Sequence, residues 1–225
     1  LKKSSSEIKL DSNTFNIIVV SSSTDYFRSL TTGPWATPGS WQSSSDNVNW
    51  ITATLAPTSS ANAITIQSGH TVTVGASATA NNLTIDATGV LTVNSSFSIS
   101  GTNTVNGTWN QTTGTAISNS GTLNFNANSI YNHNPNGGTI PTATWDVAST
   151  CNIKGMTLST PSGLGQTFGI VNWNCPSQST FSIIGAAGLF KPKGLFTITN
   201  TNGNLLELES AGTGACGWPR ADPGR

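Results

Sequence analysis

Short runs of alternating apolar and polar residues follow one another along the chain from residue 63. In the first run, "AITI", Ile64 and Ile66 fall on one face and Thr65 on the other. A period of two residues is the signature of a β-strand. The alternation therefore predicts short strands at residues 63–66, 70–74, 81–85, 89–93, 96–100, 103–105, 121–125 and 129–134.

Glycines stand between these runs, where a corner of the chain needs a positive φ that glycine adopts readily. Few of the corners carry the Asn-Gly or Asp-Gly signal of a hairpin. We therefore predict an all-β fold, a right-handed parallel β-helix whose coils stack on an apolar interior and whose outward Thr and Asn residues form ladders. A β-sandwich or jelly roll is the alternative, because hairpins can produce a similar strand spacing. The predicted corner glycines are Gly69, Gly75, Gly89, Gly101, Gly107 and Gly121.

Changes in pattern divide the chain into four parts. Residues 1–12 are predicted to be a linker or tail, and residues 13–62 an N-terminal cap over the first coil. Residues 63–211 are predicted to form the β-helix, with longer and less regular coils towards the end. Residues 212–225 lose the alternation and are predicted to be a C-terminal linker or scar.

The cap segment is rich in Gly, Pro and Trp. Within it, "FNIIVV" (15–20) is predicted to be a strand, because it is too short to cross a bilayer. Trp35, Trp41 and Trp50 are predicted to seal the N-terminal end of the solenoid.

Charged residues make up 8% of the chain and the formal net charge is zero. No basic stripe is present, so the pattern does not favour nucleic-acid binding. No apolar run approaches the ~20 residues that span a bilayer, so membrane insertion is not expected. A low-charge β protein rich in Thr and Asn is typical of secreted or cell-surface material. The first residues show no signal peptide, so secretion would imply that the signal has been removed.

Three cysteines, Cys151, Cys175 and Cys216, form no C-x-x-C motif, so a zinc site is not expected. The main interpretation is that they are buried or free thiols. A disulfide between Cys151 and Cys175 is the alternative in an oxidising compartment.

The segments "ITIQSGHTVTV", "NNLTIDATGVLTV", "FGIVNWNCPSQSTFSI" and "GLFTITNTNGNLLEL" resemble the secreted β-helical modules of Bacteroidetes-type bacteria. The resemblance covers about residues 33–210. Such modules occur in large surface adhesins and beside polysaccharide-degrading enzymes, and they include a β-helical carbohydrate-binding family attached to a xylanase. The resemblance implies a non-catalytic extracellular module, tethered to a catalytic domain, that binds a plant polysaccharide, with xylan as the best guess.

The alternatives are a structural or adhesive segment of a large surface protein, and a β-helix polysaccharide lyase or hydrolase. An enzyme of the second kind needs clustered acids or a basic residue. Residues 63–145 hold Asp86 as their one acid and no Lys or Arg. Glu207 and Glu209 share a face, but such a pair is a common edge-protecting device. We predict no catalytic residue, no metal and no cofactor; a calcium ion at Asp86 would have one carboxylate ligand.

Aromatic rings bind sugars by stacking on their C–H faces. Trp109, Trp145 and Trp173 lie in the less regular part of the predicted solenoid, and Tyr131 and His133 share a face of one strand. Plain periodicity places the first two tryptophans inside as core residues, whereas a corner at Gly107 or Pro141 could shift them outward. The predicted ligand-binding residues are Trp109, Tyr131, His133, Trp145, Asp146 and Trp173. His70 is predicted to be a hydrogen-bonded corner residue.

Overall fold

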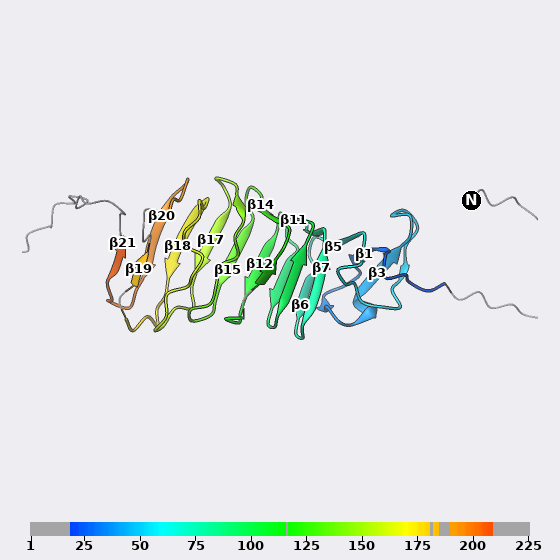
Figure 1. Cartoon of the computed structure of the whole chain (residues 1–225), viewed down its shortest axis with the longest axis horizontal. Coiled ribbons are helices and arrows are strands. Elements are labelled where there is room, and N and C mark those ends of the chain that lie inside the picture. The colour runs from blue at the N-terminus through cyan, green and yellow to red at the C-terminus, as the bar shows by residue number, and fades with distance from the viewer. Residues whose placement is uncertain (1–18, 116, 181, 185–189, 209–225) are drawn as a thin grey trace, which may run out of the picture.

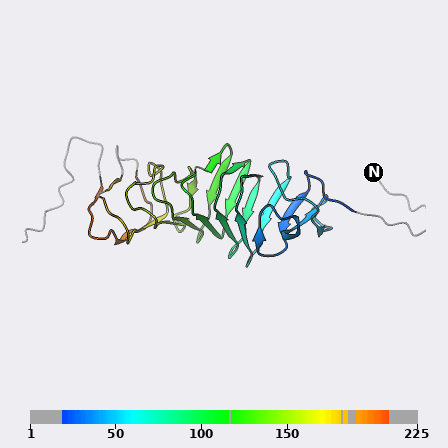
Figure 2. The same ribbon diagram turned by 90° about the horizontal axis from the view of Figure 1, so that it is seen from below.

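The chain winds into an elongated parallel β-solenoid of about 5 turns (Figure 1; Figure 2 shows it from below). The computed structural model describes residues 19–115, 117–180, 182–184 and 190–208. The segments predicted as linkers, 1–12 and 212–225, lie outside the described residues. The described part contains one short 3-10 helix, η1 (Pro38–Ser40), and otherwise strands and turns.

Three sheets run along the solenoid, and each coil contributes a strand to two or three of them. The first sheet has the order β16-β14-β11-β8-β5-β1-β3-β4. Its strands are β1 (Tyr26–Ser29), β3 (Trp41–Ser44), β4 (Ile51–Thr52), β5 (Ala63–Ile66), β8 (Leu83–Ile85), β11 (Thr102–Val105), β14 (Thr122–Phe125) and β16 (Thr144–Trp145).

The second sheet has the order β2-β6-β9-β12-β15-β17-β18-β20 and extends furthest towards the C-terminal end. Its strands are β2 (Gly33–Pro34), β6 (Thr71–Val74), β9 (Val90–Val93), β12 (Thr108–Gln111), β15 (Ile130–His133), β17 (Thr150–Ile153), β18 (Ile170–Asn174) and β20 (Phe196–Asn200).

The third sheet is shorter and has the order β13-β10-β7. Its strands are β7 (Ala78–Asn81), β10 (Phe97–Ser100) and β13 (Ile117–Asn119). A separate pair, β19 (Ser182–Ile184) and β21 (Leu206–Leu208), lies at the C-terminal end.

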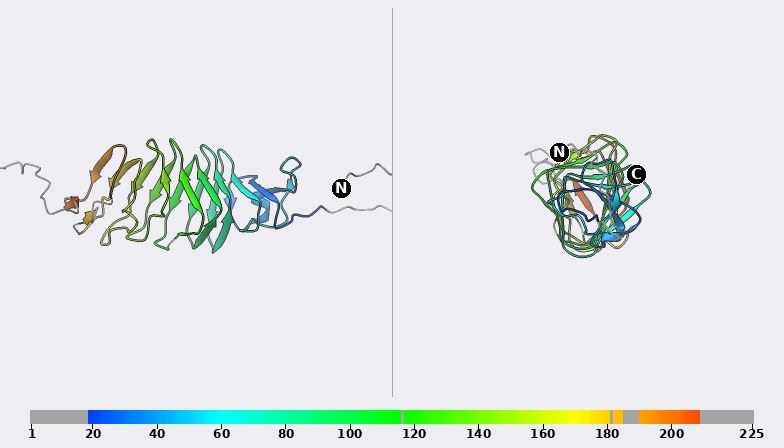
Figure 3. Two further views of the ribbon diagram at one scale, coloured as in Figure 1. Left: turned by 45° about the horizontal axis from the view of Figure 1, so that its top comes forward. Right: turned by 90° about the vertical axis from the view of Figure 1, so that its right-hand side faces the viewer.

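Successive coils stack in parallel register. The chain passes from β5 through β6 and β7 to β8, which pairs with β5 in parallel. Thr102 likewise pairs with Thr122, one coil later. Seen along the axis, the coils superimpose around one interior (Figure 3, right). The predicted all-β parallel solenoid is therefore confirmed, and the sandwich alternative is not.

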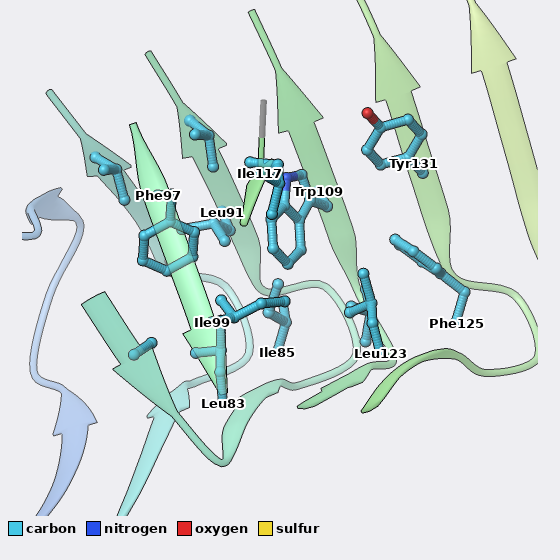
Figure 4. Packing of buried hydrophobic residues seen from close by; sticks show 14 of the residues in the cluster. Leu83, Ile85, Leu91, Phe97, Ile99, Trp109, Ile117, Leu123, Phe125 and Tyr131 are labelled. Carbon is cyan, nitrogen blue, oxygen red and sulfur yellow. The ribbon is translucent and has the colours of Figure 1, made fainter. Parts of the chain in front are cut away.

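Apolar side chains of all three sheets fill this interior (Figure 4). Ile64, Ile66, Val72 and Val74 are fully buried, as the alternation predicts. Burying a branched aliphatic side chain stabilises a fold by about 1.5–3 kcal/mol. This shared interior is therefore the main source of stability for coils that are too short to fold alone.

Antiparallel strands end the solenoid on its N-terminal side. β1 pairs with β5 in parallel but with β3 in antiparallel, and β4 pairs with β3. Trp35 and Trp41 are buried there, with ring centroids 5.1 Å apart, as predicted for residues that seal the end. The strand predicted at residues 15–20 is wrong where the structure describes it, because Val19 and Val20 are exposed and outside any strand.

Two of the predicted corner glycines have a positive φ, namely Gly69 (+78°) and Gly101 (+65°). Gly107 serves a different purpose, since a side chain there would overlap the backbone oxygen of Gly89 in the preceding coil. Other corners use non-glycine residues with positive φ, such as Thr88 and Asn128. The glycines therefore mark positions where neighbouring coils come close together, as well as positions where the chain turns.

Cys151 and Cys175 are both buried free thiols. Cys151 pairs with Val171 in the β17–β18 register, and Cys175 lies four residues after Val171, directly after the end of β18. Four extended residues span about 13 Å, beyond the roughly 7 Å limit of a disulfide. The alternative of a disulfide between them is therefore excluded, and burial raises the pKa of the Cys151 thiol. Cys216 lies outside the described residues.

Candidate functional site

The aromatic residues that were predicted to form a binding surface lie inside the solenoid. Trp109, Trp173 and Tyr131 have no exposed area, and Trp145 is 1% exposed. In the register of the second sheet, Trp109 pairs with Leu91 and Tyr131, all on the inward face. The prediction that these rings contact a ligand is wrong, because the period of two continues through the corners and turns them inward.

These rings fill the solenoid core instead. Trp145 stacks on Phe125 with ring centroids 4.2 Å apart and planes 7° apart, and Tyr131 packs edge-on against it. The indole nitrogen of Trp145 donates to Gln166 Oε1 at 2.9 Å, and that of Trp173 donates to Gln178 Oε1 at 3.0 Å. The indole nitrogens of Trp145 and Trp173 are therefore satisfied within the chain, whereas that of Trp109 is buried without a hydrogen-bond partner among the described residues.

His133 is also buried, contrary to the prediction that it contacts a ligand. Its Nε2 lies 2.7 Å from the carbonyl oxygen of Gly137, and its Nδ1 lies 3.2 Å from the hydroxyl of Tyr131. Because a carbonyl can only accept, Nε2 carries the proton and the Tyr131 hydroxyl donates to Nδ1. Burial lowers the pKa of His133 below its ordinary value.

This buried histidine should make the protein less stable in mild acid. The pKa of His133 is lower in the folded state than the ordinary value of about 6.5 in the unfolded chain. The unfolded state therefore binds more protons below pH 6.5, and the free energy of unfolding falls by up to about 1.4 kcal/mol per pH unit. We expect a lower melting temperature at pH 5 than at pH 7.5, and a smaller difference in His133→Gln. An equal difference in both proteins would contradict this role.

Asp146 is the one predicted binding residue on the surface. Its Oδ1 accepts a hydrogen bond from the amide of Ala148 at 2.8 Å, which fixes the turn after β16. It lines a shallow hollow with Asn124, Asn126, Val147 and Lys193. The exposed ring faces that were predicted to accompany it are absent, since its neighbour Trp145 is buried.

Among the tryptophans and tyrosines that the structure describes, Tyr26 and Trp50 are half-buried and the others are buried. Both line a hollow of about 160 Å³ on the outer side of the first sheet, which we call the Trp50 hollow. Phe27 lies beneath it as a core residue. The lining residues are Tyr26, Phe27, Arg28, Asn47, Trp50, Ala63, Thr65 and Gln67.

Strand geometry places Tyr26 and Arg28 on the same outward face of β1, with Phe27 between them pointing inward. The guanidinium carbon of Arg28 lies 4.1 Å from the ring centroid of Trp50. Its Nε donates to Gln42 Oε1 on β3 at 2.8 Å. Two neighbours thus hold the guanidinium beside the indole.

The loop that presents Trp50 is held by Asp46. Its carboxylate accepts hydrogen bonds from the amides of Val48 and Asn49, the side chain of Asn49 and the hydroxyl of Ser44. The backbone amide of Asn49, the Asn49 side chain, the Val48 amide and the Ser44 hydroxyl together lower the pKa of Asp46 well below its ordinary value. Asn47 has a positive φ of 60° within this turn. The aromatic side chain after the loop is therefore placed by local hydrogen bonds that periodicity does not encode.

A larger groove of about 640 Å³ lies between the N-terminal end and the third sheet. Trp35 and Pro57 contribute apolar lining, and Thr79 and Ser98 contribute hydroxyls. Trp35 is only 3% exposed, and its indole nitrogen donates to the carbonyl of Pro57. The groove therefore offers neither an open aromatic face nor a charged group to a ligand.

An asparagine ladder runs along the outer face of the second sheet. Asn172, Asn152 and Asn132 each donate from Nδ2 to Oδ1 of the asparagine one coil earlier, at 2.9, 2.9 and 2.7 Å. Asn110 receives the last of these bonds. The predicted outward ladders are therefore confirmed for asparagine, and this surface satisfies much of its own hydrogen-bonding capacity.

No family model matches the chain, and no curated protein or solved structure matches it either. Within the described ranges, three or more His, Cys, Asp or Glu side chains do not come together in a group that could hold a metal ion. The same ranges contain no helix with the length and hydrophobicity needed to cross a membrane.

The Trp50 hollow was missed because Trp50 was assigned to the seal of the solenoid. One signal in the sequence points to it. Arg28 is the one lysine or arginine between residues 10 and 153, and Tyr26 lies two residues before it, on the same face of a strand.

Proposed function

We propose that this protein is a non-catalytic carbohydrate-binding module and that it holds a plant polysaccharide at the Trp50 hollow. The observation that carries the proposal is that Tyr26 and Trp50 meet in one hollow. Both side chains are half-buried, whereas the six other Trp and Tyr rings of the described chain are buried. Exposed aromatic rings supply apolar area and a π-face for sugar C–H groups. Asn47, Thr65 and Gln67 supply hydrogen-bonding groups around them.

The size of the hollow suits part of a polymer rather than a free oligosaccharide. At about 160 Å³ it is smaller than the roughly 300 Å³ of a pocket for a drug-sized ligand. It would hold one sugar unit of a chain that continues over the solenoid surface. The resemblance to β-helical modules of secreted Bacteroidetes-type proteins makes xylan the first polymer to test, with a tethered enzyme as the expected companion.

The positions of the acids support a non-catalytic role. Asp86 and Asp146 occupy equivalent corners after β8 and β16, three coils apart, with Asn106 and Asn126 between them. Coils about 4.8 Å apart place these two carboxyl groups about 14 Å apart. Glycosidase pairs lie roughly 5 to 9.5 Å apart.

The test is affinity electrophoresis of the whole chain on xylan, β-glucan, pectin and cellulose. We expect retardation by at least one polymer and about a tenfold weaker interaction in Trp50→Ala, because a stacking ring contributes about 0.5–1.5 kcal/mol beyond its buried area. Trp50→Phe, which keeps a ring, should retain part of the binding.

Val48→Ala is the matched control, since Val48 is exposed in the same loop but does not line the hollow. Its binding should equal that of the unaltered protein. Absence of retardation on every polymer would refute the proposal and favour a structural segment of a surface protein. Release of sugar by the purified chain would favour the enzyme.

A further inference from the structure

The guanidinium of Arg28 is a fixed cation on a nearly uncharged surface. It is half-buried, stacked 4.1 Å from the Trp50 centroid and held through Nε by Gln42. Arg28 pairs with Gln42 on one side and with Thr65 on the other in the first sheet. Its side chain is therefore ordered before any ligand arrives, which reduces the entropy lost on binding.

Neither Asp25 nor Asp46 forms an ion pair with this cation. Asp46 is bound by Ser44, Val48 and Asn49 of its own loop, and Asp25 accepts from the amide of Ser22. Within the part of the chain that the structure describes, the side-chain contacts of Arg28 are those with Gln42 and Trp50, and neither partner is a carboxylate. Arg28 lines the hollow, and the printed hydrogen bond uses its Nε and not its two terminal nitrogens.

A guanidinium fork matches the two oxygens of a carboxylate, and such charge-assisted pairs are about twice as strong as neutral hydrogen bonds. A ligand that places a carboxylate beside aromatic rings and amide groups is an acidic sugar. We infer that the Trp50 hollow recognises a uronic acid unit of a polysaccharide, with its carboxylate on Arg28 and its ring against Trp50 and Tyr26. This inference rests on the proposed function and names the sugar class at the same site.

The charges elsewhere in the molecule make this inference specific to Arg28. The net charge is zero, and the described lysines, Lys154, Lys191 and Lys193, follow β17 or lie further along the chain. An acidic polymer would therefore not be attracted by a general basic surface. Its preference over a neutral polymer should depend on one side chain.

The experiment compares polymers that differ only in the carboxylate. Glucuronoxylan and polygalacturonate are each tested beside their carboxyl-reduced forms, by affinity electrophoresis and by calorimetry with soluble fragments. We expect at least one native polymer to bind about tenfold more tightly than its reduced form. Arg28→Gln should remove that preference, because it should weaken binding of the native polymer more than binding of the carboxyl-reduced one.

Lys154→Gln is the matched control, because it removes an exposed cation far along the solenoid. It should keep the full preference, and the melting temperatures of both variants should confirm that they are folded. The comparison of polymers on the unaltered protein does not depend on any variant folding.

Equal binding of native and reduced polymers would overturn the uronic acid inference while leaving polysaccharide binding intact. Preferential binding that persists in Arg28→Gln would overturn it as well. If a neutral polysaccharide that has been sulfated binds as tightly as the native acidic polymer, the result would overturn carboxylate recognition in favour of general anion binding. Binding of no polysaccharide at all would overturn both this inference and the proposed function.

Discussion

Trp145→Ala should lower the free energy of unfolding by about 3–5 kcal/mol, the usual cost of removing a buried tryptophan. Trp145 is 1% exposed, stacks on Phe125 at 4.2 Å and packs edge-on against Tyr131 at 6.0 Å. Its removal would leave a large cavity and would remove one of the two hydrogen bonds that Gln166 Oε1 accepts, the other coming from the amide of Ala143. We expect the melting temperature to fall by about 10 °C or more.

This substitution also separates the core aromatics from the binding aromatics. Trp145→Phe should lose less stability than Trp145→Ala and should bind polysaccharide as the unaltered protein does. Trp50→Ala should show the opposite pattern, with weakened binding and a melting temperature within a few degrees. Denaturant unfolding and affinity electrophoresis on the same samples would measure both. A Trp145→Ala protein of normal stability with impaired binding would overturn the assignment of Trp145 to the core.

Asn103→Leu should be similarly damaging for a different reason. Asn103 is fully buried, its Oδ1 accepts from the amide of Leu83 at 3.1 Å, and its Nδ2 donates to the carbonyls of Ser100 and Thr122, each at 3.0 Å. This one side chain therefore joins three successive coils. Leucine would remove these three hydrogen bonds, each of which contributes about 0.5–1.5 kcal/mol, so we expect a loss of about 3 kcal/mol.

Thr104→Val is the control for Asn103→Leu. Thr104 follows it on β11 but lies half-buried on the outer face. The control should change the free energy of unfolding by less than about 0.5 kcal/mol, as most surface substitutions do. Equal stability of Asn103→Leu and Thr104→Val in denaturant unfolding would show that the Asn103 hydrogen bonds contribute little.

The fold could be predicted from the sequence because burial of apolar side chains drives it, and the alternation of apolar and polar residues indicates which side chains are buried. Each predicted strand between residues 63 and 134 overlaps a strand of the structure. The strands β12 and β13 were missed because polar residues, Gln111 and Asn119, stand at positions where the alternation expects apolar ones. In β7 the inward positions are alanines, which give little contrast with polar neighbours.

The binding residues could not be predicted in the same way. The period of two predicts that Trp109 and Trp145 point inward, and both are buried. The expectation that a corner shifts them outward was wrong. The exposure of Trp50 depends on the turn held by Asp46, which local hydrogen bonds shape and alternation does not record. Its contact with Arg28 joins β1 to the loop after β3, and such a contact follows only from the folded sheet.

The antiparallel strands β3 and β4 give the solenoid a direction of growth. They close one end, where the buried Trp41 lies, so a parallel coil can be added only at the other end. Each coil then serves as the template on which the next one pairs, and each coil contacts mainly its neighbours. Because a ribosome delivers the capped end first, winding can keep pace with synthesis. Loosening the cap should therefore slow the folding of coils that it never touches.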